Sequence, residues 1–127
     1  MEILLLRAKL VLANMFNINI SNFEIHTTRR IEVVEARRFL VYFLRDELGL
    51  TYQKIAKLIP AISNHATAIH HYKKLTELMD VERKTADKYT EFRKSIVEDS
   101  MIEKELIAML DQRNKLNNQI YKLKKLL

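Results

Sequence analysis

The chain has one glycine, one proline, no cysteine and no tryptophan among its 127 residues. A β-rich fold needs glycine and proline for its tight turns, whereas leucine, lysine, glutamate, isoleucine and alanine, which are common here, favour helices. We therefore expect an all-α protein. A single glycine also excludes a Gly-x-x-x-x-Gly-Lys phosphate-binding loop. The absence of cysteine excludes disulfides, thiolate zinc sites and cysteine nucleophiles, and it is compatible with a cytoplasmic protein.

Long hydrophobic runs are also missing. The apolar stretch in residues 1–16 is interrupted by Glu2, Arg7 and Lys9 and is too short to span a bilayer, so we expect neither a secreted nor a membrane protein. The net charge of +6 favours a polyanionic partner. The excess is larger in residues 1–79, with 11 basic against 7 acidic residues, than in the remainder, with 11 against 9.

Apolar residues at three- and four-residue spacing predict a first helix over residues 1–16. Its expected inward positions are Ile3, Leu4, Ala8, Leu12 and Met15. The sequence NINIS, residues 17–21, then predicts a break. Residues 31–48 are apolar nearly all round, which is typical of a central helix, and Gly49 is expected to end it.

Residues 50–75 carry the features of a helix-turn-helix. Thr51 is a suitable N-cap for a short helix that Pro60 ends, and Ser63 or Asn64 can cap a longer second helix. Such a motif places the first residues of its second helix against base edges in the major groove. These residues are Asn64, His65, Ala66 and Thr67, while Lys73 and Lys74 follow where phosphates can be met.

Two pairs of adjacent arginines lie before and within the predicted central helix. Arg29 and Arg30 end a polar segment, HTTRR, and Arg37 and Arg38 follow two turns later. A DNA-binding loop and an ordinary solvated loop explain the first pair equally well from these residues alone.

Residues 80–127 are expected to form a helical extension of a DNA-binding domain that spans residues 1–79. Residues 80–99 are highly charged, with a thin apolar stripe formed by Ala86, Tyr89, Phe92 and Ile96. Over about residues 102–127, apolar residues alternate steps of four and three, as in a coiled coil, with Leu106, Arg113, Ile120 and Leu127 at a and Ile102, Met109, Leu116 and Leu123 at d. This segment either pairs two chains into a homodimer or packs back on its own chain.

The first 79 residues resemble the C-terminal DNA-binding domain of the bacterial replication initiator DnaA, whose helix-turn-helix lies in a fold similar to that of Trp repressor. The family signature Asp-His-Thr-Thr-Val is similar to residues 64–68, Asn-His-Ala-Thr-Ala, and the basic pair that follows it falls on Lys73 and Lys74. The family's Ala-Arg-Gln, whose arginine reads a base in the major groove, is similar to residues 36–38, Ala-Arg-Arg. The resemblance therefore implies that Arg37 contacts a base and that Arg38, next to it, also binds DNA.

Two further matches concern the DNA backbone and the minor groove. The family's Leu-Ser-Leu-Pro-x-Ile, which touches phosphate, is similar to residues 50–55, and the resemblance extends this role to Thr51, Tyr52, Gln53 and Lys54. Arg29, beside Arg30, stands where the family has a loop arginine that enters the minor groove.

The residues that differ from the family affect which DNA sequence would be recognised. Asn64, Ala66 and Arg38 replace family residues, and the turn at residues 60–63 is one residue longer. We therefore expect a DnaA-box-like site that need not be the initiator's own box. Because no phosphate loop is present, the initiator's ATPase is not part of this chain. A small module of this kind resembles a phage or mobile-element protein.

We expect no catalytic site, metal or cofactor, and no small-molecule substrate. His65, His70 and His71 are not spaced as metal ligands on one helical face, and the carboxylates are scattered among lysines and arginines. Two functions remain open. The first is a sequence-specific double-stranded DNA-binding protein, either a replication accessory or a transcription regulator. The second is a protein-interaction adaptor that acts through the C-terminal coiled coil.

Overall fold

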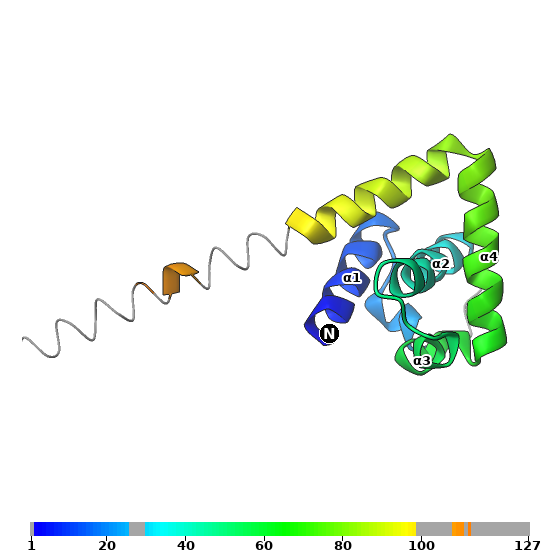
Figure 1. The fold of residues 1–127 in the computed structure, drawn as a ribbon, viewed down its shortest axis with the longest axis horizontal. Helices are drawn as coiled ribbons and strands as arrows, with labels where there is room; N and C mark the ends of the chain where they lie inside the picture. Colours follow the sequence, from blue (N-terminus) through cyan, green and yellow to red (C-terminus); the bar gives the residue numbers. More distant parts are fainter. Residues whose placement is uncertain (1, 26–29, 99–107, 111, 113–127) are drawn as a thin grey trace, which may run out of the picture. The chain divides into compact units, whose positions relative to one another are not determined.

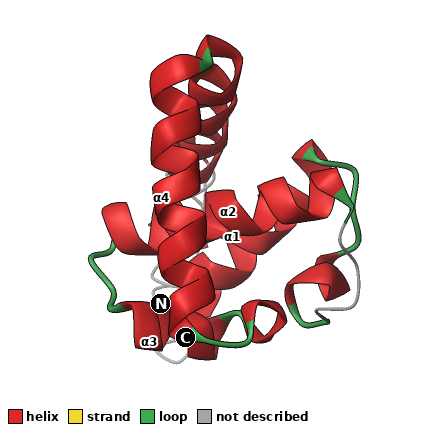
Figure 2. Cartoon of the chain, turned by 90° about the vertical axis from the view of Figure 1, so that its right-hand side faces the viewer, coloured by secondary structure: helices red, strands yellow, loops and turns green. Residues whose placement is uncertain are grey.

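The structure, a computed structural model, describes residues 2–25, 30–98, 108–110 and 112. Every regular element in this part of the chain is a helix, which confirms the all-α prediction (Figure 2). Within the same residues, no helix combines the length and apolar character needed to cross a bilayer. The chain divides into two compact units, residues 1–96 and residues 97–127.

The first unit is built around one central helix. Helix α1 spans Glu2–Met15, α2 spans Ile31–Asp46, α3 spans Tyr52–Leu58 and α4 spans His65–Val81. Two short 3₁₀ helices, η1 (Ile20–Phe23) and η2 (Pro60–Ile62), lie in the connections, and residues 83–98 form a further helix (Figure 1). Helix α2 packs against α1, α3 and α4. The predicted central position of this helix is therefore confirmed.

Burial follows the apolar pattern most closely in α2. Its buried side chains lie all round the helix, as expected for an element covered on most sides. They are Val33, Ala36, Arg37, Phe39, Leu40, Val41, Phe43 and Leu44. The helix ends before Gly49, which adopts the left-handed conformation with φ of 64° that glycine accommodates without strain.

The inward face of α1 differs in part from the prediction. Ala8 and Leu12 are fully buried as expected, but Ile3 is 65% exposed. An inward position is instead taken by Lys9, whose ammonium group lies 3.0 Å from a carboxylate oxygen of Glu24. The expectation for Ile3 was wrong because α1 is apolar on more than one side, so spacing alone does not select the face that meets α2.

The helix of residues 83–98 completes the core of the first unit. Its side chains Tyr89, Phe92 and Ile96 are buried, and the Phe92 ring lies 5.5 Å from Phe43 and 6.3 Å from Phe39, measured between centroids. The predicted apolar stripe is thus confirmed as a buried edge. The compact unit consequently extends to residue 96, beyond the boundary predicted after residue 79.

The predicted coiled coil at residues 102–127 falls almost entirely outside the described residues. Residues 108–110 are helical, and Met109 and Leu110 are 64% and 57% exposed. The pairing of this segment stays a prediction.

Candidate nucleic-acid interface

Helices α3 and α4 are joined by a short connection and packed against each other, and α2 contacts both (Figure 1). Each helix begins at a side-chain cap. The hydroxyl of Thr51 accepts a hydrogen bond of 3.2 Å from the backbone N–H of Lys54, and Oδ1 of Asn64 accepts one of 2.9 Å from the N–H of Thr67. The caps satisfy N–H groups that have no partner inside the helix. Of the two candidates for the second cap, Asn64 takes the position.

The connection is tight because it ends in a three-residue turn. The N–H of Asn64 donates to the carbonyl of Ile62 over 2.7 Å, and Ser63 between them has φ of 60° and ψ of −42°. This hydrogen bond and these angles are close to those of a γ-turn with positive φ, which is uncommon and strained for a residue with a side chain. The turn sets the direction in which α4 leaves η2.

The outer face of α4 divides into two halves of different charge. In its first half, Ala66, His70 and Lys73 are exposed at helical spacing, and His65 is exposed beside them. In the second half, the exposed positions become acidic: Glu77 and Asp80. Because phosphates repel carboxylates, only the first half of α4 is suited to approach a nucleic acid.

Thr67 has a more restricted position than its neighbours. It is half-buried, and its hydroxyl donates to Oδ1 of Asn64 over 3.2 Å. This bond lies beside the backbone cap on the same oxygen. Both residues therefore fix the start of α4, while His65 and Ala66 present their side chains to solvent.

Basic and polar side chains also line the outer face of α3. Gln53, Lys54 and Lys57 are exposed. Tyr52 is half-buried instead, with the Arg45 guanidinium 4.5 Å from its ring centroid and the Tyr72 ring 6.1 Å away. Tyr52 thus joins α3 to α2 and α4, and the lysines are the groups of this helix that can reach a phosphate.

Arg37 lies inside the fold. Only 6% of it is exposed; its Nε donates to the carbonyl of Asn22 over 2.9 Å and its Nη2 to the carbonyl of Ile25 over 2.6 Å. Burial lowers the pKa of its guanidinium from the ordinary value. This geometry favours a role in holding the chain that leads into residues 26–29, in place of the base contact that the family resemblance implies.

The remaining arginines differ in their surroundings. Arg30 is exposed at the start of α2, and its Nε lies 3.5 Å from the carboxylate of Glu32. Arg38 is half-buried, and its Nε is enclosed without a hydrogen-bond partner in the described part of the chain. Arg29 lies outside the described residues.

Lys73 is exposed and Lys74 is half-buried, so the two members of the basic pair differ in access to solvent. The two neighbouring histidines differ more. His70 shares the exposed stripe with Lys73, whereas His71 is 9% exposed and lies close enough to Arg37 and Arg38 of α2 for their charges to affect it. Sequence reasoning did not include His70 or Lys57 among the interface residues. The signal for His70 was its spacing of four from Ala66 and three from Lys73.

The buried imidazole of His71 responds to acid. Its Nδ1 is enclosed and has no hydrogen-bond partner among the described residues. Burial, together with the positive charges of Arg38, His70 and Arg37, lowers its pKa from 6.5 to about 4. His71 is therefore neutral in the folded protein at neutral pH, and acid favours the unfolded chain, in which it protonates more readily.

We expect this histidine to make folding pH-dependent. Its contribution is constant above pH 6.5 and is lost as the pH falls from 6.5 towards 4, because the unfolded state takes up the proton first. The loss between pH 8 and pH 5 should be about 2 kcal/mol of unfolding free energy. Urea titrations at a series of pH values measure it.

The matched comparison uses the two adjacent histidines. His71→Gln should remove most of this pH-dependent loss, whatever its effect on stability at pH 8, while His70→Gln at the exposed neighbour should retain it. An unchanged difference between pH 8 and pH 5 in His71→Gln would show that other groups cause the acid sensitivity.

Within the described part of the chain, no group of three or more histidine or acidic side chains is placed to hold a metal ion. No protein-family profile matches the chain, and neither does any curated protein sequence. The resemblance to the DnaA domain therefore rests on the residues quoted for it.

Proposed function

We propose that this chain is a sequence-specific double-stranded DNA-binding protein that places the first half of α4 in the major groove. The observation that carries the proposal is the exposed stripe of Ala66, His70 and Lys73, on a helix whose first turn is fixed by the Asn64 cap. A capped helix N-terminus with small and polar residues is suited to approach base edges closely. The biological role that fits such binding is that of a replication accessory or a transcription regulator.

Distinct groups would contact bases and backbone. In this proposal His65 and His70 donate to base edges, and Ala66 leaves room for a thymine methyl group. Lys54 and Lys57 on α3 contact phosphates, which position the protein without selecting a sequence. The acidic second half of α4 stays outside the groove because Glu77 and Asp80 would meet phosphates.

The polar loop provides a second contact. Arg29 and Arg30 precede α2, and an arginine that enters a narrow minor groove favours A·T-rich steps because of their stronger negative potential. Arg37, bonded to the carbonyls of Asn22 and Ile25, would support this loop from inside.

Selection of duplexes from a random library tests the proposal directly, because a sequence-specific protein enriches a motif. On the enriched site, His65→Ala and His70→Ala should each cost about 1–3 kcal/mol of binding free energy, and less on random duplex. Lys54→Ala should weaken both alike and reduce the salt dependence of binding. Fluorescence anisotropy at several salt concentrations measures all three.

Glu77→Gln is the control on the same helix. It removes an exposed negative charge near the expected backbone, so affinity should stay equal or rise on every duplex. Recovery of no motif, or equal losses on selected and random DNA for the histidine variants, would contradict base reading by α4.

We further propose that the predicted coiled coil at residues 102–127 joins two chains. Met109, at a predicted d position, is 64% exposed in the single chain and thus available to a partner. The full chain should be a dimer and a fragment ending at residue 98 a monomer, as measured by light scattering. The dimer should prefer paired half-sites, since the second head binds at high effective concentration. A monomeric full chain at micromolar concentration would contradict this pairing.

The exposed apolar residues of the second unit also suit the alternative function, a protein-interaction adaptor. Val97, Met109 and Leu110 are all more than half exposed. Salt separates the two functions: DNA binding through lysine and arginine weakens steeply as salt rises, while an apolar helical interface does not.

A further inference from the structure

The corner between α4 and residues 83–98 contains a cavity of about 280 Å³. Its apolar floor is formed by Phe39 of α2 and Leu75 of α4, which are only 2% and 1% exposed. This volume is close to the lower limit for ligand sites, about 300 Å³, so it suits a small molecule. The cavity lies behind the outer face of α4 and is separate from the residues proposed to contact DNA.

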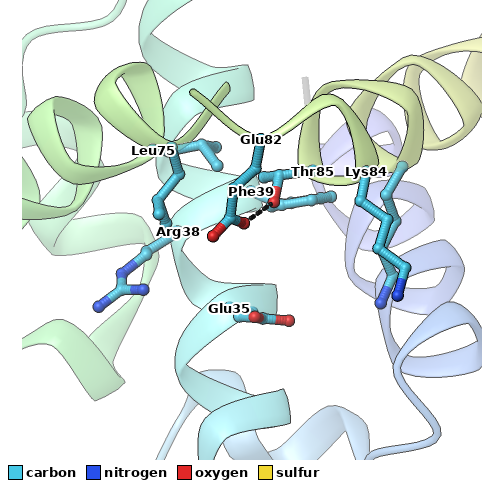
Figure 3. Close-up of a pocket in the computed structure, with 9 residues that line it drawn as sticks. Glu35, Arg38, Phe39, Leu75, Glu82, Lys84 and Thr85 are labelled. Atoms are coloured by element: carbon cyan, nitrogen blue, oxygen red, sulfur yellow. Dashed lines mark hydrogen bonds between the residues drawn. The ribbon is translucent and has the colours of Figure 1, made fainter. Parts of the chain in front are cut away.

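Charged side chains of both signs surround this apolar floor. Glu35 and Glu82 are acidic, and Arg38, Lys84 and Lys88 are basic. Figure 3 shows the carboxylates of Glu35 and Glu82 directed at the space in front of Phe39, with Lys84 on its far side. A ligand in this space would meet the two carboxylates at one end and the lysines at the other, while the Arg38 guanidinium points away from the space in front of Phe39.

Glu35, Glu82, Lys84 and Lys88 do not neutralise one another's charge. None of them forms an ion pair within the residues that the structure describes. The carboxylate of Glu82 is held in place by the hydroxyl of Thr85, which donates to it over 2.8 Å. The ammonium group of Lys88 lies 4.0 Å from the ring centroid of Phe16, a contact that leaves its charge unneutralised.

We propose that this corner cavity binds a small zwitterion with an apolar body, such as a free amino acid with a large apolar side chain. Its ammonium group pairs with Glu35 and Glu82, its carboxylate pairs with Lys84 and Lys88, and its apolar part covers the floor. The residues come from α2, from α4 and from residues 82–88, so the ligand links three segments of the first unit.

The test compares three probes with the same ring: L-phenylalanine, 2-phenylethylamine, which lacks the carboxylate, and 3-phenylpropionate, which lacks the amine. Isothermal titration calorimetry with the full chain should show L-phenylalanine binding at least about tenfold more tightly than either, since each probe loses one charge-assisted pairing. No DNA is present, so the result is independent of the proposed DNA binding.

Four variants separate the cavity from general surface charge. Glu35→Gln and Lys84→Gln should each weaken L-phenylalanine binding about tenfold. The matched controls Glu91→Gln and Lys94→Gln, at exposed positions of residues 83–98 that do not line the cavity, should leave it unchanged. Absence of binding at millimolar probe, equal affinity for all three probes, or equal affinity in Glu35→Gln and the unmodified chain would overturn the proposal.

Discussion

The Phe92→Ala variant is expected to lose about 3–5 kcal/mol of unfolding free energy, the largest effect of any single substitution considered for this chain. Phe92 is completely buried, and its ring contacts those of Phe39, Phe43 and Tyr89 at centroid distances between 5.5 and 6.3 Å. Truncation removes this contact area and leaves a cavity that the surrounding rings cannot fill completely. Chemical denaturation followed by circular dichroism measures the loss.

Two control substitutions lie in the same helix. Phe92→Leu keeps most of the apolar volume and should cost clearly less than alanine. Glu91→Gln, at the exposed neighbouring position, should change the free energy by less than about 0.5 kcal/mol. A loss below about 1 kcal/mol for Phe92→Ala would mean that residues 83–98 do not pack on the core in solution.

The same packing predicts how fragments behave. A fragment of residues 1–79 exposes the surface of Phe39 and Phe43 that Phe92 covers, so it should unfold at lower denaturant concentration than a fragment of residues 1–98, or not fold at all. The sequence indicated the apolar stripe of this helix but not which surface it covers. A narrow apolar stripe among charged residues indicates a helix with one buried edge. This pattern is the same whether the edge packs on the protein's own core or on a partner.

Local signals predicted most of the element boundaries. The N-caps at Thr51 and Asn64, the stop at Pro60 and the left-handed Gly49 each act within a few residues, so their effect can be read from the chain without knowledge of the fold. The apolar spacing of α2 was equally informative because it is apolar on nearly every side.

Positions that depend on distant contacts could not be predicted in this way. The exposure of Ile3 and the burial of Lys9 are decided by Glu24 and by the side of α1 that meets α2. His70 and His71 are chemically identical neighbours, and only the packing of α4 on α2 makes one exposed and the other buried. Spacing identifies a helical face, but it does not decide between two faces of similar character.

Arg37 shows the same limit at the candidate site. Its position in the sequence matched a base-reading arginine, but its guanidinium donates hydrogen bonds to carbonyls 12 and 15 residues earlier in the chain. No local pattern indicates such a contact, because backbone carbonyls are present at every residue. The function of the arginine therefore has to be tested by separating stability from DNA recognition.

Arg37→Met is expected to lower the unfolding free energy by about 3 kcal/mol. Methionine retains much of the apolar length but has no donor, so the carbonyls of Asn22 and Ile25 lose charge-assisted hydrogen bonds of 2.9 and 2.6 Å in a site that is largely closed to water. Arg37→Lys keeps one charged donor and should lose less. Urea denaturation of the three proteins measures the series.

Arg30→Met is the matched control, because Arg30 is exposed and its ion pair in the described part of the chain is with Glu32 at 3.5 Å. It should change the free energy by less than about 0.5 kcal/mol. The selected DNA site then distinguishes the two roles of Arg37. If Arg37 is a positioning residue, its replacement lowers stability and weakens DNA recognition through the loop that Arg37 supports. The DNA affinity of Arg37→Lys should then be higher than that of Arg37→Met. If Arg37→Met kept the stability of the unmodified chain but showed a relaxed base preference, Arg37 would instead be a base-contacting residue in the major groove.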